Sequence, residues 1–219
     1  MIFITGDTHG DVDYFKLFSL KEKRLSHDDY LIICGDAGIC WSPYCFQQFL
    51  DLYNNVGCTI IFVDGNHENF TMLNSCPLVE FKGAFMHQID KHIFHVLRGE
   101  IMTLDGKTFL CLGGAVSTDK AMRTPFVSWW PEEEITYRDV NNAIENLKKV
   151  SFKVDYVITH CSDTKTVNKA FCYKKDICTQ QLLFIDELVE YRHWFFGHYH
   201  VDRNISKKKT CLYNSIIQL

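Results

Sequence analysis

Residues 2–10 read Ile-Phe-Ile-Thr-Gly-Asp-Thr-His-Gly, an apolar run that ends abruptly in glycine, carboxylate and imidazole. Such a run followed by a turn signal predicts a short core strand at residues 2–5. The same pattern recurs at residues 30–36, where Tyr-Leu-Ile-Ile-Cys precedes Gly-Asp. It recurs again at residues 59–67, where Thr-Ile-Ile-Phe-Val precedes Asp-Gly-Asn-His. The sequence therefore predicts three buried strands, each ending in polar residues.

Helices are expected between these strands, at about residues 12–20 and from about Pro43, a residue that suits a first helical turn. In the first helix, Tyr14, Phe15, Leu17 and Phe18 are expected to share the buried face. Strands that alternate with helices predict parallel pairing with right-handed crossovers. The polar segments would then lie at the carboxyl ends of the strands, where ligands bind in open α/β sheets.

The rest of the chain predicts a second sheet and a long loop. Residues 93–97, 100–104 and 107–112 are expected to form an antiparallel meander in that sheet, since Asp105-Gly106 is a strong hairpin signal. The loop at residues 113–131 is too long to be a mere connector. A helix at 132–149, a strand at 154–159, a helix at 179–191, a strand at 193–196 and a final hairpin to residue 219 follow. No linker-like boundary interrupts the chain, which favours a single domain over residues 1–219.

Composition narrows the classes of partner. The chain has 219 residues, 47% of them hydrophobic, and a formal net charge of −4, which argues against a broad nucleic-acid surface. No apolar run is long enough to span a bilayer, so no membrane partner is expected. Ten cysteines without a CxxC pair are typical of free thiols, and the sequence opens on a strand rather than a leader. We therefore expect a cytoplasmic protein, of an oligomeric state that the sequence does not indicate.

Five polar segments, at residues 6–10, 35–38, 65–68, 159–160 and 197–200, carry the candidate chemistry. They contribute Asp7, His9, Asp36, Asn66, His67, His160, His198 and His200. Each segment alone is more typical of a turn or a helix cap. Together they favour two adjacent divalent metals, because a carboxylate can bridge two cations through separate oxygens. Oxygen and nitrogen ligands without thiolate suit Mn, Fe, Zn, Ni or Co better than Mg or Ca.

The segments read GDTHG, GDAG, GNHE, TH and GHYH, and this set resembles the GDxHG, GD, GNH, H and GHxH pattern of the calcineurin-like metallophosphoesterase superfamily. The resemblance extends from residue 6 to residue 200 and implies an α/β fold, a four-layer αββα sandwich of two mixed β-sheets flanked by helices. It implies two divalent metal ions, Mn²⁺ being expected first. One would be held by Asp7, His9, Asp36 and His200, and the other by Asp36, Asn66, His160 and His198. Asp36 would bridge them, and His67 would be the general acid.

The implied reaction is hydrolysis of a small phosphoester. A hydroxide bridging the two metals would attack phosphorus in line, and His67 would protonate the leaving oxygen. A further metal ligand or a hydrogen-bond donor to the phosphate are the alternatives for His67. A phosphodiester or nucleotide-like substrate is favoured. The alternatives are a nucleoside polyphosphate hydrolase, a phosphomonoesterase or protein phosphatase, and a non-catalytic scaffold with the same fold.

Two positions depart from the protein Ser/Thr phosphatase branch, whose pattern is GDxxDRG with an arginine before GNHE. Ile39 and Asp64 stand where that branch has an aspartate and an arginine. Asp64 or Glu68 could orient His67 instead. Substrate contacts are expected from the 113–131 loop; the candidates are Asn66, Ser117, Lys120 and Arg123. Trp129 and Trp130 either cover the site, where they could stack on a base, or fill a gap in the core.

Overall fold

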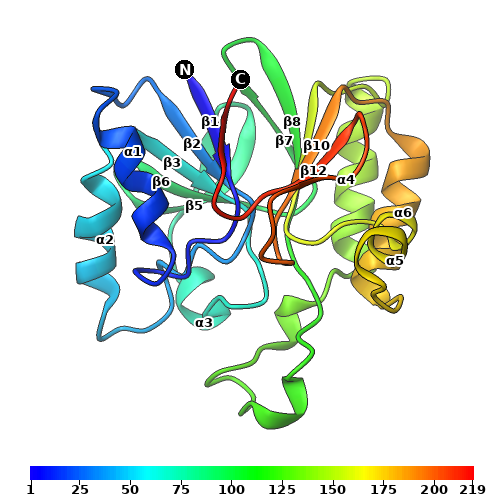
Figure 1. Cartoon of the computed structure of the whole chain (residues 1–219), viewed down its shortest axis with the longest axis horizontal. Helices are drawn as coiled ribbons and strands as arrows, with labels where there is room; N and C mark the ends of the chain where they lie inside the picture. Colours follow the sequence, from blue (N-terminus) through cyan, green and yellow to red (C-terminus); the bar gives the residue numbers. More distant parts are fainter.

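Two β-sheets pack face to face at the centre of the molecule, and helices cover the outer face of each (Figure 1). The computed structural model describes residues 1–219. The first sheet has the strand order β13-β1-β2-β3-β6-β5-β4, and the second has the order β11-β12-β10-β9-β8-β7. Each combines parallel and antiparallel pairs. The fold is therefore the four-layer αββα sandwich implied by the motifs.

The elements are short, and their bounds are as follows. The first sheet contains β1 (Ile2–Thr5), β2 (Tyr30–Ile33), β3 (Thr59–Phe62), β4 (Leu78–Phe81), β5 (Ala84–Asp90), β6 (Ile93–Val96) and β13 (Ile216–Gln218). The second contains β7 (Glu100–Leu104), β8 (Lys107–Leu112), β9 (Tyr156–Thr159), β10 (His193–Phe196), β11 (Arg203–Asn204) and β12 (Lys209–Cys211). The helices are α1 (Phe18–Lys21), α2 (Phe46–Asn54), α3 (Phe70–Leu73), α4 (Tyr137–Lys149), α5 (Thr164–Phe171) and α6 (Ile177–Leu188). None of them has both the length and the apolar character that crossing a bilayer requires.

Alternation along the strands distributes apolar side chains between three layers. In β1, Phe3 packs toward α2, whereas Ile2 and Ile4 pack toward the second sheet. This follows from the two-residue period of a strand, which sends successive side chains to opposite faces. The middle layer joins the sheets through residues such as Phe109 and Ile158. A third layer lies between the second sheet and helices α4 and α6.

Two strand predictions were wrong. β6 was expected to begin a meander in the second sheet, but it lies in the first, parallel to β3 and antiparallel to β5. The preceding strands β4 and β5 were missed because polar residues interrupt their alternation. The final hairpin forms only in part, because β11 and β12 pair antiparallel but the chain does not end with that hairpin. β12 runs parallel to β10, and β13 returns to the first sheet beside β1.

The helix predictions also need correction at their ends. Tyr14 and Leu17 are buried as expected, but Phe15 and Phe18 are 70% and 44% exposed, because a 3₁₀ turn precedes α1 and rotates them outward. Helix α4 begins at Tyr137 rather than at residue 132. Thr136 caps it, and its backbone N–H donates to the Asp139 carboxylate at 2.7 Å. Such a reciprocal capping box sets the first turn of a helix. Helix α5 was not predicted.

We expect Phe109→Ala to lower the free energy of unfolding by about 3–5 kcal/mol, because the ring is fully buried between the sheets and leaves a cavity. Phe15→Ala is the matched control, since this ring is largely exposed and its loss should cost less than about 1 kcal/mol. Urea denaturation measures both. Equal losses in the two variants would show that the layer between the sheets is not a packed core.

Candidate metal centre

The seven candidate ligands converge at one edge of the molecule because each follows the end of a parallel strand. Asp7 and His9 follow β1, Asp36 follows β2, Asn66 follows β3, His160 follows β9, and His198 and His200 follow β10. The first sheet supplies four of them and the second sheet supplies three. The site therefore lies where the carboxyl ends of both sheets meet.

Two groups of donor atoms are close enough to share a cation. One group is Asp7, His9 and His200, and the other is Asp7, Asp36 and His160; the donor atoms of each lie within 4.8 Å of one another. Asp36 Oδ2 lies 3.4 Å from His9 Nε2 and 3.2 Å from His160 Nε2. Asp36 therefore contacts one imidazole from each group, and Asp7 contacts the imidazole of His200.

A buried carboxylate oxygen without a partner tests whether these residues fit a metal. Asp7 is fully buried, and its Oδ2 accepts no hydrogen bond although His200 Nε2 lies only 3.1 Å away. A buried carboxylate oxygen that accepts no hydrogen bond is costly unless a cation neutralises it. Asn66 Oδ1 lies 3.2 Å from His160 Nε2 and adds a neutral oxygen to the set. The donors therefore fit a divalent metal centre.

Two imidazoles are held in orientations that suit coordination. His160 Nδ1 donates to the Cys34 carbonyl at 2.8 Å, and His9 Nδ1 donates to Asp13 Oδ2 at 2.6 Å. In both residues Nε2 is left facing the carboxylates. Metal-binding histidines commonly donate their second nitrogen in this way, which fixes the tautomer and the ring.

The charges of the histidines follow from their neighbours. Burial opposes the charged form of His9 and His160, but Asp36 outweighs it and raises the pKa of His9 to about 9 and that of His160 to about 10. Burial and the nearby His160 lower the pKa of His198 to about 3. A metal needs the neutral imidazole. Cation binding must therefore release protons from His9 and His160 at neutral pH.

The backbone around the ligands is unusual. His9, Asp36, His198 and His200 have φ angles of 45°, 49°, 67° and 48°, in the left-handed region. For residues other than glycine this costs about 1–2 kcal/mol each. The side chain of Asp36 also needs space, because a Cβ on Gly65 would overlap its Oδ1. The site is thus assembled against local conformational preference.

His67 lies beside the metal ligands and is held by its backbone. Its N–H donates to Asp36 Oδ1 at 2.7 Å, and its half-buried ring lies with Asp36 in a cavity of about 240 Å³. Arg123 Nη2 lies 3.1 Å from His67 Nδ1 and 3.0 Å from Nε2. The cavity is lined by Asp36, Asn66, His67, Thr118, Asp119, Arg123, His198 and His200. The candidate metal ligands and the 113–131 loop therefore meet around His67.

The 113–131 loop extends beyond the body on the side where β1 and β2 end (Figure 1). Of its three candidate substrate contacts, only Arg123 lines the cavity, where Asp119 holds its Nε at 2.9 Å. Ser117 is buried behind Asn66: it accepts from Asn66 Nδ2 at 3.1 Å and donates to Glu133. It therefore orients the amide, and it does not line the cavity.

Lys120 is directed away from the cavity by two contacts. Its Nζ lies 3.0 Å from Glu134 Oε1 and 4.1 Å from the centre of the Trp129 ring. Trp130 is buried in the core and donates through its indole N–H to Thr71 at 3.0 Å. The sequence left open whether Trp130 covers the site or fills a gap in the core, and the structure supports core filling.

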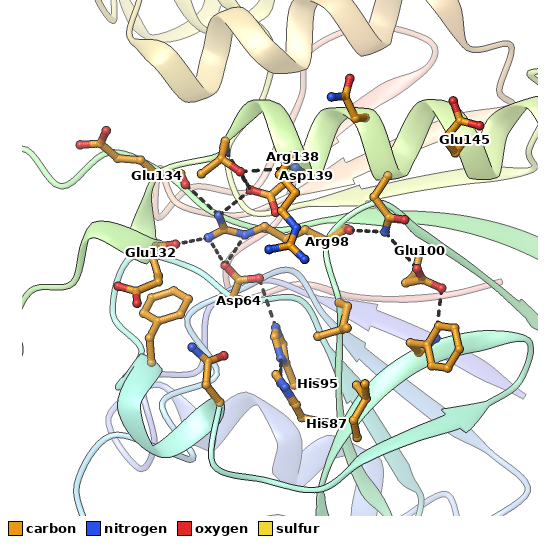
Figure 2. A pocket seen from close by; sticks show the side chains of 18 residues that line it. Asp64, His87, His95, Arg98, Glu100, Glu132, Glu134, Arg138, Asp139 and Glu145 are labelled. Carbon is orange, nitrogen blue, oxygen red and sulfur yellow. Dashed lines mark hydrogen bonds and ion pairs between the residues drawn. The ribbon is translucent and has the colours of Figure 1, made fainter.

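Neither Asp64 nor Glu68 forms a hydrogen bond with His67. The Glu68 carboxylate is fully buried and accepts from the backbone N–H of Ala37 at 2.8 Å. Asp64 accepts from Arg98 Nε at 2.9 Å and from Arg98 Nη2, and it contacts His95 Nε2 at 3.1 Å (Figure 2). Burial alone would raise the pKa of Asp64, but Arg98 and His95 outweigh it and hold the pKa below its ordinary value.

The Asp64–Arg98 pair anchors the end of the 113–131 loop. Arg98 also donates to the backbone carbonyls of Glu132, at 2.6 Å, and of Glu134, at 2.9 Å (Figure 2). These contacts occur in a cavity of about 720 Å³ beside α4. Sequence reasoning missed this network because its members are distant in the chain. Asp64 therefore stands where the protein phosphatase branch has an arginine, and it holds the end of the loop through Arg98.

We expect Arg98→Met to lower the free energy of unfolding by about 3–5 kcal/mol, since it leaves the buried Asp64 carboxylate without a counter-charge. The double variant Arg98→Met/Asp64→Asn should recover a large part of that loss because no charge remains. Urea denaturation of the single and double variants measures the coupling. If the double variant were less stable than Arg98→Met, Asp64 would not depend on Arg98.

Addition of Mn²⁺ should raise the thermal midpoint and release protons at pH 7, because His9 and His160 are protonated without a cation. A metal at 100 times its Kd stabilises the fold by about 2.7 kcal/mol. Asp36→Asn should weaken both effects strongly. Asp28→Asn, which removes an exposed carboxylate outside the cluster, is the control. A midpoint and proton count unchanged by Mn²⁺ would contradict a metal centre here.

Comparisons with known proteins identify the family and agree with the fold. The family model for calcineurin-like phosphoesterases matches residues 1–202. The fold is similar to that of phosphopantetheinyl hydrolase (PptH) from Mycobacterium tuberculosis, at 16% identity and a TM-score of 0.56 over 97% of this chain and 87% of that one. TT1561 of Thermus thermophilus is similar at 11% identity and a TM-score of 0.51, with the same two coverages. Comparison with curated protein sequences finds no match. The chain belongs to the calcineurin-like phosphoesterase family.

Proposed function

We propose that this protein is a dinuclear metal-dependent phosphoesterase that hydrolyses a small phosphoester, with a phosphodiester or nucleotide-like substrate favoured. One observation carries the proposal. The cavity of about 240 Å³ brings a buried carboxylate, an imidazole and a guanidinium together, from Asp36, His67 and Arg123. The carboxylate would hold a cation that neutralises the charge of a phosphoryl group, the imidazole would transfer a proton, and the guanidinium would bind the phosphoryl oxygens.

The proposed metal assignments follow the family pattern that the five motifs match. Asp7, His9, Asp36 and His200 would hold one cation, and Asp36, Asn66, His160 and His198 the other. Mn²⁺ is the first choice, and Fe, Zn, Ni or Co are alternatives. Asp36 is assigned to both because its Oδ2 faces both His9 and His160. When bound, the cations supply Lewis acidity and make water a nucleophile at neutral pH.

Arg123 is the proposed clamp for the phosphoryl oxygens. It is the guanidinium that lines the cavity, and Asp119 holds its Nε at 2.9 Å while its Nη2 faces His67. A planar guanidinium binds a phosphate through two parallel hydrogen bonds. Arg123 would therefore bind the phosphoryl oxygens in place of the arginine that the protein phosphatase branch has at the position of Asp64. It comes from a different segment of the chain.

His67 is the proposed general acid. Burial and the charge of Arg123 lower the pKa of His67, although Asp36 acts in the opposite direction. A bound phosphoryl anion between His67 and Arg123 would restore the charged imidazole, because it neutralises the guanidinium and accepts a hydrogen bond. The imidazolium then donates its proton to the leaving oxygen. The Asp36 carboxylate holds this residue in place through the backbone N–H of His67.

Cysteine content and the two departures from the protein phosphatase pattern bear on location and substrate. Ten free cysteines, most of them buried, favour a reducing compartment such as the cytoplasm. Neither Ile39 nor Asp64 supports a protein phosphatase. A nucleoside polyphosphate hydrolase is the second candidate, because Arg123 could bind a terminal phosphate as well as an internal one.

The test is a panel of mono-, di- and pyrophosphate esters with the Mn²⁺-loaded protein. We expect turnover of at least one class, and we expect His67→Ala to lower kcat about 10²–10⁴-fold on esters with poor leaving groups. The loss should be smaller with p-nitrophenyl esters, because a good leaving group needs little protonation. His27→Ala is the control, since this ring stacks on His92 and does not line the cavity. The proposal would be falsified if no ester were cleaved in the presence of any of the metals named.

A further inference from the structure

A second cavity, of about 310 Å³, adjoins the first at His67. It is lined by His9, Asp11, Val12, Gly38, Trp41, Phe49 and His67, and of these only His67 also lines the cavity that contains Arg123. The two cavities therefore meet at one imidazole. A group bound in one is next to a group bound in the other.

The lining of this second cavity is mainly aromatic and aliphatic. Trp41 is 40% exposed and Val12 is 67% exposed, so neither is occupied in packing the core. The Trp41 ring lies 6.0 Å from the His67 ring, at an angle of 40°. Phe49 is buried and forms the inner wall. Partly exposed aromatic surface beside a polar site is typical of a pocket for a flat ring.

The ionisable side chains of this cavity include a carboxylate but neither lysine nor arginine. Apart from the two imidazoles, Asp11 is its only ionisable side chain, and it is exposed. Arg123 and the proposed metal ligands other than His9 do not line this cavity. A second phosphate in the leaving group would meet the Asp11 carboxylate here, and neither lysine nor arginine lines the cavity to bind it. An uncharged ring meets no such opposition.

We propose that this cavity is the leaving-group subsite and that it takes a flat, uncharged ring, as an aryl alcohol or a nucleoside carries. The inference rests on the proposed function, because a general acid must contact the leaving oxygen. If His67 protonates that oxygen, the leaving group extends from His67 away from the phosphoryl group. His67 also lines the aromatic cavity, so the leaving group would extend into that cavity. Trp41 is thus a specificity-determining residue.

Binding of non-hydrolysable phosphonates tests the subsite without turnover. In calorimetric titrations of the Mn²⁺-loaded protein, 2-phenylethylphosphonate should bind about 10-fold or more tightly than ethylphosphonate, the range expected for stacking on one aromatic ring. 2-Carboxyethylphosphonate should show no such gain. The methylene phosphonate analogue of adenosine 5′-monophosphate separates the two sources of the ring: tighter binding than the phenyl compound assigns a nucleoside, and weaker binding assigns an aryl alcohol.

Trp41→Ala should reduce the preference for the phenyl compound to less than about 3-fold. Tyr44→Ala is the matched control, because this aromatic side chain is fully exposed nearby and lines neither cavity. It should retain the wild-type preference. Equal affinities for the phenyl and ethyl compounds in the wild type, or an unchanged preference in Trp41→Ala, would overturn the subsite.

Turnover of 2-phenylethyl phosphate and ethyl phosphate, measured separately, distinguishes this inference from the proposed function. Their leaving oxygens are both primary alkoxides, so a difference in kcat/KM reports on the ring. Cleavage of both at similar kcat/KM, with no ring preference in binding, would remove the subsite and keep the phosphoesterase. Absence of cleavage together with a ring preference lost in Trp41→Ala would remove the phosphoesterase and keep the ring-binding cavity.

Discussion

The carboxylate of Asp36 is the interaction on which the rest of the site depends. Its Oδ1 accepts the backbone N–H of His67, while its Oδ2 faces His9 and His160. The main-chain carbonyl of the same residue accepts the N–H groups of Thr8 and His9 at 3.1 and 2.9 Å. One residue therefore joins the segments that follow β1, β2, β3 and β9, across both sheets. Its position therefore bears directly on those of His9, His67 and His160.

This convergence is energetically unfavourable without a cation. Asp7 and Asp36 are both buried, and four of the ligand residues adopt left-handed backbone angles that glycine would adopt more easily. Three apolar layers, with the largest rings fully buried, hold the strand ends in place against these costs. Strain and buried charge concentrate at functional sites when the surrounding structure over-determines them. The centre is an instance of that arrangement.

Local patterns in the sequence predicted that the ligands follow strand ends, and the resemblance of the motifs to a known family implied the four-layer fold. A buried run that ends in Gly-Asp places its carboxylate at a strand end wherever the strand lies. What it did not predict depends on tertiary contacts. The side chains of Lys120 and Arg123 are three residues apart on the same loop, yet only Arg123 enters the cavity, because Glu134 and Trp129 hold Lys120 elsewhere. The role of Asp64 depends on Arg98, which follows β6 in the chain, and no spacing rule connects them.

The 113–131 loop contains none of the proposed metal ligands, although it carries Arg123. It begins directly after β8, and Arg98, which lies outside it, fixes its end before α4. The proposed phosphate clamp and the proposed metal ligands are therefore encoded in separate stretches of the gene. Insertions or deletions between those two fixed points can move Arg123 while the residues proposed as metal ligands keep their geometry.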